Sequence, residues 1–463
     1  MTDSQTKKSL STPTIVIVTL LAAGGTVFAL FMLTDIFDKK QEAKLPFARV
    51  VELTDDTADP AIWGQNFPHQ YDTFKRTVDH ERTRFGGSET LPQEPTEDDP
   101  RTAVPPNKLE HIPQLKRMWS GYAFAIDYRE KRGHAYMLED QIHTQRTKIV
   151  QQPGTCINCH ASTYNPWKEL GNGDPHAGYE IANKMPYEET KKHFSQAIAC
   201  IDCHDAKTMA LRITRPGFIE GIKALKAREG IKDYDPNTMA TRQEMRSYVC
   251  AQCHVEYYFG KDNKELVFPW HEGLKAEEML EHFDKTGFSD WTHKETGAPM
   301  VKVQHPEFEL WSKGTHAAAG VSCSDCHMPY TRVGAMKITD HQARSPLLNI
   351  NNACQTCHKV AEKNLIDRVE AIQMRTQDLR GKALDALVDL IDDIKEAKQS
   401  NAELDLSEAL DYQRKASFFV DFVVSDNSNG FHAPQEAVRI LGTSIDCSRK
   451  GQNAVRDALK KAK

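Results

Sequence analysis

The feature that most constrains the fold of this chain is a short pattern of cysteine and histidine that occurs five times. Each copy reads Cys-x-x-Cys-His, and together they use all but one of the eleven cysteines. The pattern is typical of covalent haem attachment, in which two thiols bond to the porphyrin and the adjacent imidazole becomes the proximal iron ligand. The cysteines are Cys156, Cys159, Cys200, Cys203, Cys250, Cys253, Cys323, Cys326, Cys354 and Cys357, and the histidines are His160, His204, His254, His327 and His358. The sequence therefore predicts five covalently bound haem c groups.

The spacing and composition around these motifs indicate one continuous core. The motifs follow one another at irregular intervals, which argues against a solenoid of identical units. Only 39% of the residues are hydrophobic, so we expect the porphyrins to supply much of the buried apolar surface. The net charge of −6 favours neither nucleic acid nor an anionic membrane surface as a partner. We expect a haem-bearing core over residues 41–358, and residues 359–463 as a helical part of the same domain.

The N-terminal segment, residues 1–40, is predicted to be a membrane anchor or a signal sequence. Residues 14–34 carry no charge and are long enough as a helix to cross a bilayer. A cleaved signal peptide would have a shorter apolar region, so an anchor is favoured, with a soluble periplasmic protein as the alternative. Because c-type haems are attached outside the cytoplasm, the sequence predicts a periplasmic protein tethered to the inner membrane by residues 14–34.

The predicted fold class is mainly α, with little β structure. After the last haem motif, apolar residues recur at helical spacing over 360–399 and again around 406–422. A polar break at 427–430 precedes a final helix that begins near Pro434. A shorter helix is expected from Asp59 or Pro60 to near Arg84, and residues 92–106 are expected to form a loop. The remaining cysteine, Cys447, is expected to be a buried residue without special chemistry.

The second axial ligands of the haems decide between two classes of protein. A low-spin haem needs a distal ligand, usually His or Met, in addition to its motif histidine. An electron carrier would need five such ligands, whereas an enzyme would leave one iron open for a substrate. Spacing does not decide between these alternatives, because fourteen histidines lie outside the motifs.

Several segments of the chain resemble the pentahaem cytochrome c nitrite reductases that form ammonia. The resemblance covers roughly residues 50–450 and includes the order of the five motifs. The matching stretches are Cys250–Phe259 (CAQCHVEYYF), Pro299–Glu307 (PMVKVQHPE), Trp63–His69 (WGQNFPH), Arg132–His134 (RGH), Phe288–Trp291 (FSDW), Thr339–His341 (TDH) and Gly430–Pro434 (GFHAP). The resemblance implies a six-electron reduction of nitrite to ammonium.

The resemblance also implies which histidines are the distal ligands. They are His341 for the haem of His204, His134 for that of His254, His432 for that of His327, and His316 for that of His358. The iron beside His160 is then left open. Arg146, Tyr257 and His305 would surround it, and a guanidinium and an imidazole suit an anionic substrate and the supply of protons.

A calcium site is implied beside the open iron. Its ligands would be the Glu256 carboxylate, the Gln304 amide oxygen, and the backbone carbonyls of Tyr257 and Lys302. A set of oxygen ligands suits a hard cation. Without the resemblance, one carboxylate and one amide would indicate calcium only weakly.

The chain departs from many members of that family at the open haem. Those members have Cys-x-x-Cys-Lys there, whereas this chain has His160 as the proximal residue. The alternative to an enzyme is a carrier of electrons with a fifth distal ligand, for which His143, His111 and His69 are candidates; His143 is also a rival basic group to His305. Within the enzyme class, hydroxylamine and sulfite are alternative substrates.

The resemblance also implies partners. It implies a homodimer formed through the long C-terminal helices. The predicted anchor makes a membrane quinol-oxidising cytochrome, or another periplasmic protein, a plausible electron donor.

Overall fold

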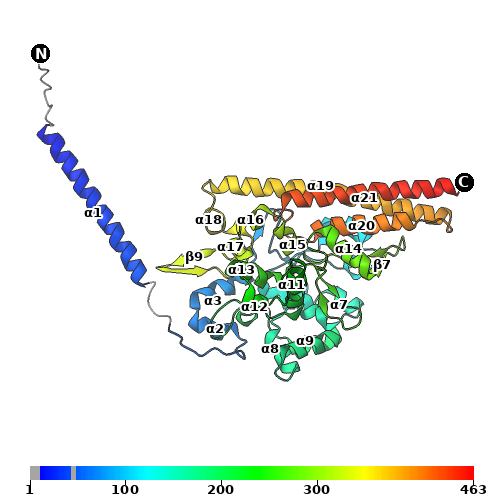
Figure 1. The fold of residues 1–463 in the computed structure, drawn as a ribbon, viewed down its shortest axis with the longest axis horizontal. Helices are drawn as coiled ribbons and strands as arrows, with labels where there is room; N and C mark the ends of the chain where they lie inside the picture. The colour runs from blue at the N-terminus through cyan, green and yellow to red at the C-terminus, as the bar shows by residue number, and fades with distance from the viewer. Residues whose placement is uncertain (1–10, 43–47, 463) are drawn as a thin grey trace, which may run out of the picture.

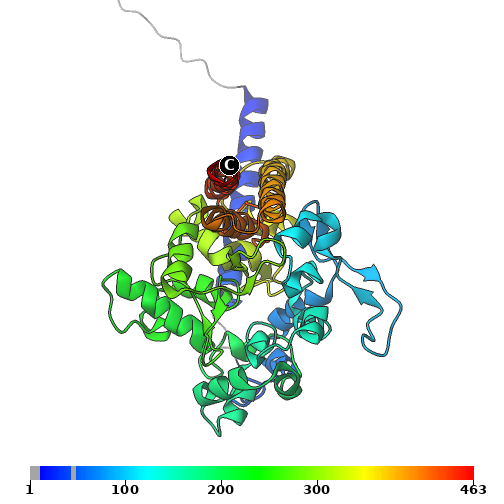
Figure 2. The same ribbon diagram turned by 90° about the vertical axis from the view of Figure 1, so that its right-hand side faces the viewer.

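Three long helices at the C-terminal end of the chain run along one side of the molecule (Figure 1). They are α19 (Glu362–Ser400), α20 (Ser407–Val424) and α21 (Pro434–Lys461), and they lie side by side in both views (Figures 1 and 2). Leu387 and Ile391 of α19 and Ile440 of α21 are fully buried between them and the core. The predicted helices over 360–399, around 406–422 and from Pro434 are therefore confirmed.

The computed structural model describes residues 11–42 and 48–462, and residues 1–10 of the predicted N-terminal segment lie outside that part. Helix makes up 56% of it and strand 7%, which confirms the mainly α class. The helices before α19 are α1 (Thr12–Glu42), α2 (Pro60–Asn66), α3 (Pro68–Lys75), α4 (Lys108–His111), α5 (Gln114–Met118), α6 (Met137–Ile142), α7 (Gln145–Ile149), α8 (Tyr164–Leu170), α9 (Pro175–Lys184), α10 (Tyr187–Thr190), α11 (Pro216–Arg228), α12 (Pro236–Met239), α13 (Arg242–Ala251), α14 (Ala276–Thr286), α15 (Glu307–Ser312), α16 (Thr315–Ala318), α17 (Cys323–His327) and α18 (Ile350–Ala353).

Strands occur only as short antiparallel pairs in the described part of the chain. The pairs are β1 (Arg82–Thr83) with β2 (Gly86–Gly87), β3 (Leu91–Pro92) with β4 (Ala103–Val104), β5 (Tyr258–Phe259) with β6 (Leu266–Val267), β7 (Trp291–Thr292) with β8 (Pro299–Met300), and β9 (Tyr330–Val333) with β10 (Met336–Thr339). Two of these pairs, β5–β6 and β7–β8, flank the segments predicted to line the open haem.

The N-terminal helix α1 extends away from the remaining elements (Figure 1). Its large apolar side chains are exposed, including Leu21 at 72% and Phe31 at 67%. Residues 12–40 form a helix long and apolar enough to cross a membrane. A signal sequence would have the same properties, so these features fit both an anchor and a signal sequence.

The prediction of one helix from Asp59 or Pro60 to near Arg84 is wrong. Two helices, α2 and α3, replace it, and Phe67 lies between them. Pro68 cannot donate a backbone hydrogen bond and its ring clashes with a preceding helical turn, so the first helix ends there. The Asp59 side chain caps α2 by accepting a hydrogen bond of 2.8 Å from the Ala61 amide.

Candidate active site and haem sites

Four pairs of histidine rings face each other across the core. The distances between ring centroids are 6.4 Å for His134 and His254, 6.3 Å for His204 and His341, 6.2 Å for His316 and His358, and 6.3 Å for His327 and His432. A metal bound between two imidazoles, at about 2 Å from each nitrogen with about 1 Å more to each ring centre, separates the centroids by roughly 6 Å. The residues present therefore fit four irons with two axial histidines each.

In several of these paired histidines, and in His160, the Nδ1 atom already takes part in a hydrogen bond. The Nδ1 atoms of His204 and His327 each lie 3.0 Å from a backbone oxygen, and that of His160 lies 3.2 Å from one. On the opposite side of their pairs, His341 Nδ1 lies 2.8 Å from the Thr339 carbonyl and His432 Nδ1 lies 3.0 Å from Asp426. An Nδ1–H that donates to oxygen fixes the tautomer and leaves Nε2 free for a metal.

Burial keeps most of the motif histidines in the neutral form that binds a metal. It lowers the pKa to about 4 for His160, His204 and His327, and to about 3 for His254. His432 differs, because the Asp426 carboxylate outweighs the effect of burial and raises the pKa of its ring. A charged partner on Nδ1 makes the imidazole more electron-rich toward a metal.

His160 lacks a facing histidine of this kind among the described ring contacts. Its ring is half-buried, and Nδ1 is oriented by the carbonyl of Met137 at the start of α6. After burial, the positive charges of Lys131 and Arg146 lower its pKa further, whereas the Met137 carbonyl and Asp140 oppose them. The surroundings of His160 thus differ from those of the other four motif histidines.

The three predicted catalytic side chains gather on this side of the core. Arg146 on α7 donates a 2.6 Å hydrogen bond to the Asp127 carbonyl, and its guanidinium stacks 4.3 Å from the centre of the Phe124 ring. Burial is the main reason for the raised pKa of Tyr257, and the thiols of Cys159 and Cys156 add to it, which places the phenol beside the first motif.

His305 lies in the same region, with Lys131 as its direct partner. Lys131 Nζ is 3.4 Å from His305 Nε2. Burial lowers the pKa of His305 well below its usual value, and the charges of Lys131, His254 and His160 lower it further. The imidazole is therefore held neutral, in contact with the Lys131 amine.

The rival histidines are engaged elsewhere. His143 lies 3.7 Å from Asp99, whose carboxylate also accepts hydrogen bonds from the buried Arg101. His111 is exposed at the end of α4, and His69 is half-buried on α3. In the described part of the chain, no ring contact places any of them opposite His160.

A group of buried carboxylates lies where the calcium site was predicted. Glu256 is fully buried. Its Oε2 atom accepts a hydrogen bond from the backbone N–H of Gln304, whereas Oε1 has no hydrogen-bond partner. Burial raises the pKa of Glu256, and that of neighbouring Glu309 to about 8. An unpaired buried carboxylate oxygen is costly unless a proton or a cation satisfies it, so this residue fits a cation.

Two of the other predicted calcium ligands lie close to each other. Gln304 Nε2 donates a 3.3 Å hydrogen bond to the Lys302 carbonyl, so ligation of a cation by both residues requires the Gln304 amide to turn its oxygen inward. The Lys302 ammonium points away, 3.1 Å from Asp421 and 3.0 Å from Ser425. A lysine can thus offer its carbonyl without placing its charge at the cation. The described residues form no cluster of three or more His, Cys, Asp or Glu side chains suited to a metal.

The motif cysteines form a connected series. The Cys253 thiol raises the pKa of Cys159 in the first motif, and the thiols of Cys323 and Cys203 raise the pKa of Cys250 in the third. The charge of Cys354 acts in the same way on Cys326. The third motif therefore lies next to the first, second and fourth, and the fourth lies next to the fifth.

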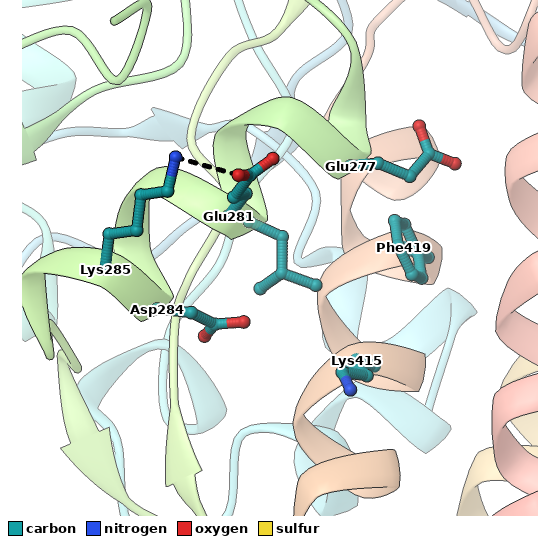
Figure 3. Close-up of a pocket in the computed structure, with 7 residues that line it drawn as sticks. Glu277, Glu281, Asp284, Lys285, Lys415 and Phe419 are labelled. Atoms are coloured by element: carbon teal, nitrogen blue, oxygen red, sulfur yellow. Dashed lines mark ion pairs between the residues drawn. The ribbon is translucent and has the colours of Figure 1, made fainter. Parts of the chain in front are cut away.

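Figure 3 shows a separate hollow on the surface. It is formed between α14 and α20, and its lining includes an ion pair of 2.8 Å between Lys285 and Glu281. None of the predicted catalytic or ligating residues lines it.

Sequence reasoning missed several residues that shape the site. Asp127 orients Arg146, Asp421 holds the Lys302 ammonium, and Lys131 contacts His305. Of these, only Lys131 had a signal in the sequence, because it directly precedes the Arg132-Gly-His134 stretch. Cys447 is buried in α21, as predicted.

Comparisons with known proteins agree on one family. The model of the cytochrome c552 family matches residues 59–463. A cytochrome c-552 of Bacteroides fragilis is 36% identical over 447 residues, which cover 94% of this chain and 85% of that protein. A cytochrome c-552 of Maridesulfovibrio salexigens is 34% identical over 448 residues, which cover 92% of this chain and 82% of that protein.

A solved structure supports the same assignment at the level of the fold. The cytochrome c nitrite reductase of Desulfovibrio desulfuricans, described with two calcium sites in its catalytic subunit, superposes with a TM-score of 0.74 and is 31% identical. The match covers 88% of each chain. The family resemblance predicted from the sequence is thereby confirmed. This chain belongs to the cytochrome c552 family.

Proposed function

We propose that this protein reduces nitrite to ammonium at a haem c iron beside His160, and that four further haems supply it with electrons. The family and the solved nitrite reductase support an oxidoreductase of this type. The observation that carries the proposal is the asymmetry among the motif histidines: four face a second imidazole, whereas no described ring contact pairs His160 with one, and the charges of Lys131 and Arg146 act on its pKa. Hydroxylamine, which carries a partly reduced nitrogen, is a second substrate of the same site.

The side chains around His160 are suited to an anion that loses oxygen. When bound, the haem supplies the iron and the electrons for the reduction. Arg146 is held by the Asp127 carbonyl, so its charge has a fixed position from which it attracts nitrite and stabilises negative charge on the leaving oxygens. His305 is neutral and contacts Lys131, which supports a role for His305 in proton transfer to the substrate. The Tyr257 phenol, whose pKa is raised, remains a hydrogen-bond donor.

We propose that a calcium ion joins the segments that carry Tyr257 and His305. Glu256 and Gln304 would bind it through their side chains, and Tyr257 and Lys302 through their carbonyls. Because Glu256 precedes Tyr257 and Gln304 precedes His305, an ion held between these ligands restrains both catalytic side chains. The buried, unpaired Glu256 Oε1 supports this site.

The location and partners follow from the rest of the chain. We propose a periplasmic protein anchored by α1, which accepts electrons from a membrane quinol-oxidising cytochrome or another periplasmic donor. The apolar residues exposed on α1 support an anchor. Homodimerisation through α19 and α21 is proposed on the resemblance, and both helices lie along an outer side of the molecule (Figure 1).

The direct test is turnover of isotopically labelled nitrite by the purified protein with a reduced dye as electron donor. We expect labelled ammonium as the product, with six electrons consumed per nitrite. Oxidation of the dye that yields no ammonium, or no oxidation at all in protein loaded with haem, would contradict the proposal.

A further inference from the structure

Lys131 has an environment that is unusual for a lysine. It lies in the segment between α5 and α6 and is half-buried, and Nζ lies 3.4 Å from His305 Nε2 and 5.8 Å from the centre of the Tyr128 ring. No carboxylate forms an ion pair with Lys131 among the described residues, although ion pairs are formed by its neighbours Arg129 and Arg132. Among residues 11–42 and 48–462, Lys131 is therefore left without a carboxylate in ion-pair contact.

The charges nearest to Lys131 make this arrangement costly without a ligand. Burial lowers the pKa of Lys131, and the positive charges of Lys108 and Arg146 lower it further, whereas the nearby Tyr128 phenol and Glu307 oppose them. A buried cation is normally paired, because the loss of hydration is not otherwise offset. Lys108 shows the ordinary solution nearby, with Glu130 at 3.5 Å. The missing counter-charge at Lys131 points to an anion that is not part of the polypeptide.

Two anions could occupy this place, the substrate or a propionate group of a bound haem. The contact of Lys131 with His305, and its effect on the pKa of His160 together with Arg146, favour the substrate position. Resting on the proposed function, we propose that Lys131 is a substrate-binding residue that supplies a second positive charge, beside that of Arg146, for nitrite at the open haem. A second positive charge would make the site more selective for an anionic substrate than for a neutral one.

The experiment compares nitrite with hydroxylamine, which is uncharged at neutral pH. The nitrite dissociation constant of the oxidised Lys131→Met holoprotein is measured by optical titration, and KM is measured for both substrates. We expect nitrite binding to weaken by about tenfold or more, which corresponds to about 1.4 kcal/mol. The KM for hydroxylamine is expected to change by less than about twofold, and Lys131→Arg to restore most of the nitrite affinity.

Lys108→Met is the matched control, because it removes a nearby lysine that already has a carboxylate partner in Glu130. Unchanged nitrite affinity in Lys131→Met would overturn the proposal, and so would an equal loss of activity with both substrates. A shifted haem potential without a change in nitrite affinity would assign Lys131 to a propionate and overturn it as well. If the unsubstituted protein neither binds nor reduces nitrite, the proposed function itself fails, which is a separate result.

Discussion

A histidine that binds iron through one ring nitrogen usually donates a hydrogen bond through the other. His204, His327 and His341 meet this condition through backbone carbonyls, and His432 meets it through Asp426. His305 differs, because its contact is an ammonium group. The hydrogen-bond partner thus distinguishes histidines suited to binding iron from His305, which is suited to proton transfer.

Replacing His305 by glutamine should separate catalysis from assembly. Glutamine keeps a polar side chain of similar reach but does not transfer protons, so kcat/KM for nitrite should fall by about a hundredfold or more. Haem content, measured from the pyridine-treated protein, should stay unchanged. His282→Gln, at a buried histidine bonded to Tyr258 at 2.9 Å, is the control. A parallel loss of haem and activity would mean that His305 is structural.

Replacing His341 by alanine should open a second iron. The ring faces His204 at 6.3 Å, so its removal should convert one low-spin haem into a high-spin haem without loss of covalent attachment. Electron paramagnetic resonance measures the change. His143→Ala, in which the removed ring pairs with Asp99, should leave the spectrum unaltered; the opposite pattern would exchange the roles of the two residues.

At the scale of elements, the active-site segments are held by buried polar contacts between distant parts of the chain. Lys302 lies in the segment after β8, and its ammonium forms an ion pair with Asp421 of α20. Both side chains are fully buried. Burial raises the pKa of Asp421 in spite of this lysine, so desolvation outweighs the attraction for the carboxylate. The pair therefore specifies position more than it adds net stability.

Removing one partner of this pair should be much worse than removing both. Asp421→Ala leaves an unpaired buried ammonium, and we expect the free energy of unfolding to fall by about 3–5 kcal/mol. The double variant Lys302→Met with Asp421→Leu should recover most of that loss. Denaturant unfolding of the holoprotein measures both, and equal destabilisation in the single and the double variant would refute this account of the pair.

Removing calcium should loosen the same segments. After treatment with a chelator, nitrite turnover should decrease, and added Ca²⁺ should restore it while Mg²⁺ should not, because Mg²⁺ tolerates such an irregular ligand set poorly. Glu256→Gln should weaken calcium binding by roughly tenfold or more. Metal analysis of the purified protein gives the stoichiometry, and full activity in calcium-free protein would remove the ion from the account.

At the scale of the whole molecule, the sequence predicted what local patterns encode. Each haem motif is a run of five consecutive residues, and the three C-terminal helices have a clear helical periodicity. Both features could therefore be predicted from the sequence. The break between α2 and α3 also has a local signal in the sequence, which is Pro68 itself. In contrast, spacing alone did not indicate that His204 faces His341, because the fold brings these residues together; the resemblance to a family was needed. The burial of Lys131 beside His305 depends on packing in three dimensions.

The central claim is that one iron of five is open and that it is the one beside His160. The most direct measurement is the quantification of spin states by electron paramagnetic resonance in the oxidised holoprotein, before and after nitrite is added. We predict one high-spin haem for every four low-spin haems, and the loss of the high-spin signal when nitrite binds. Five low-spin haems that do not respond to nitrite would contradict the account and identify an electron carrier.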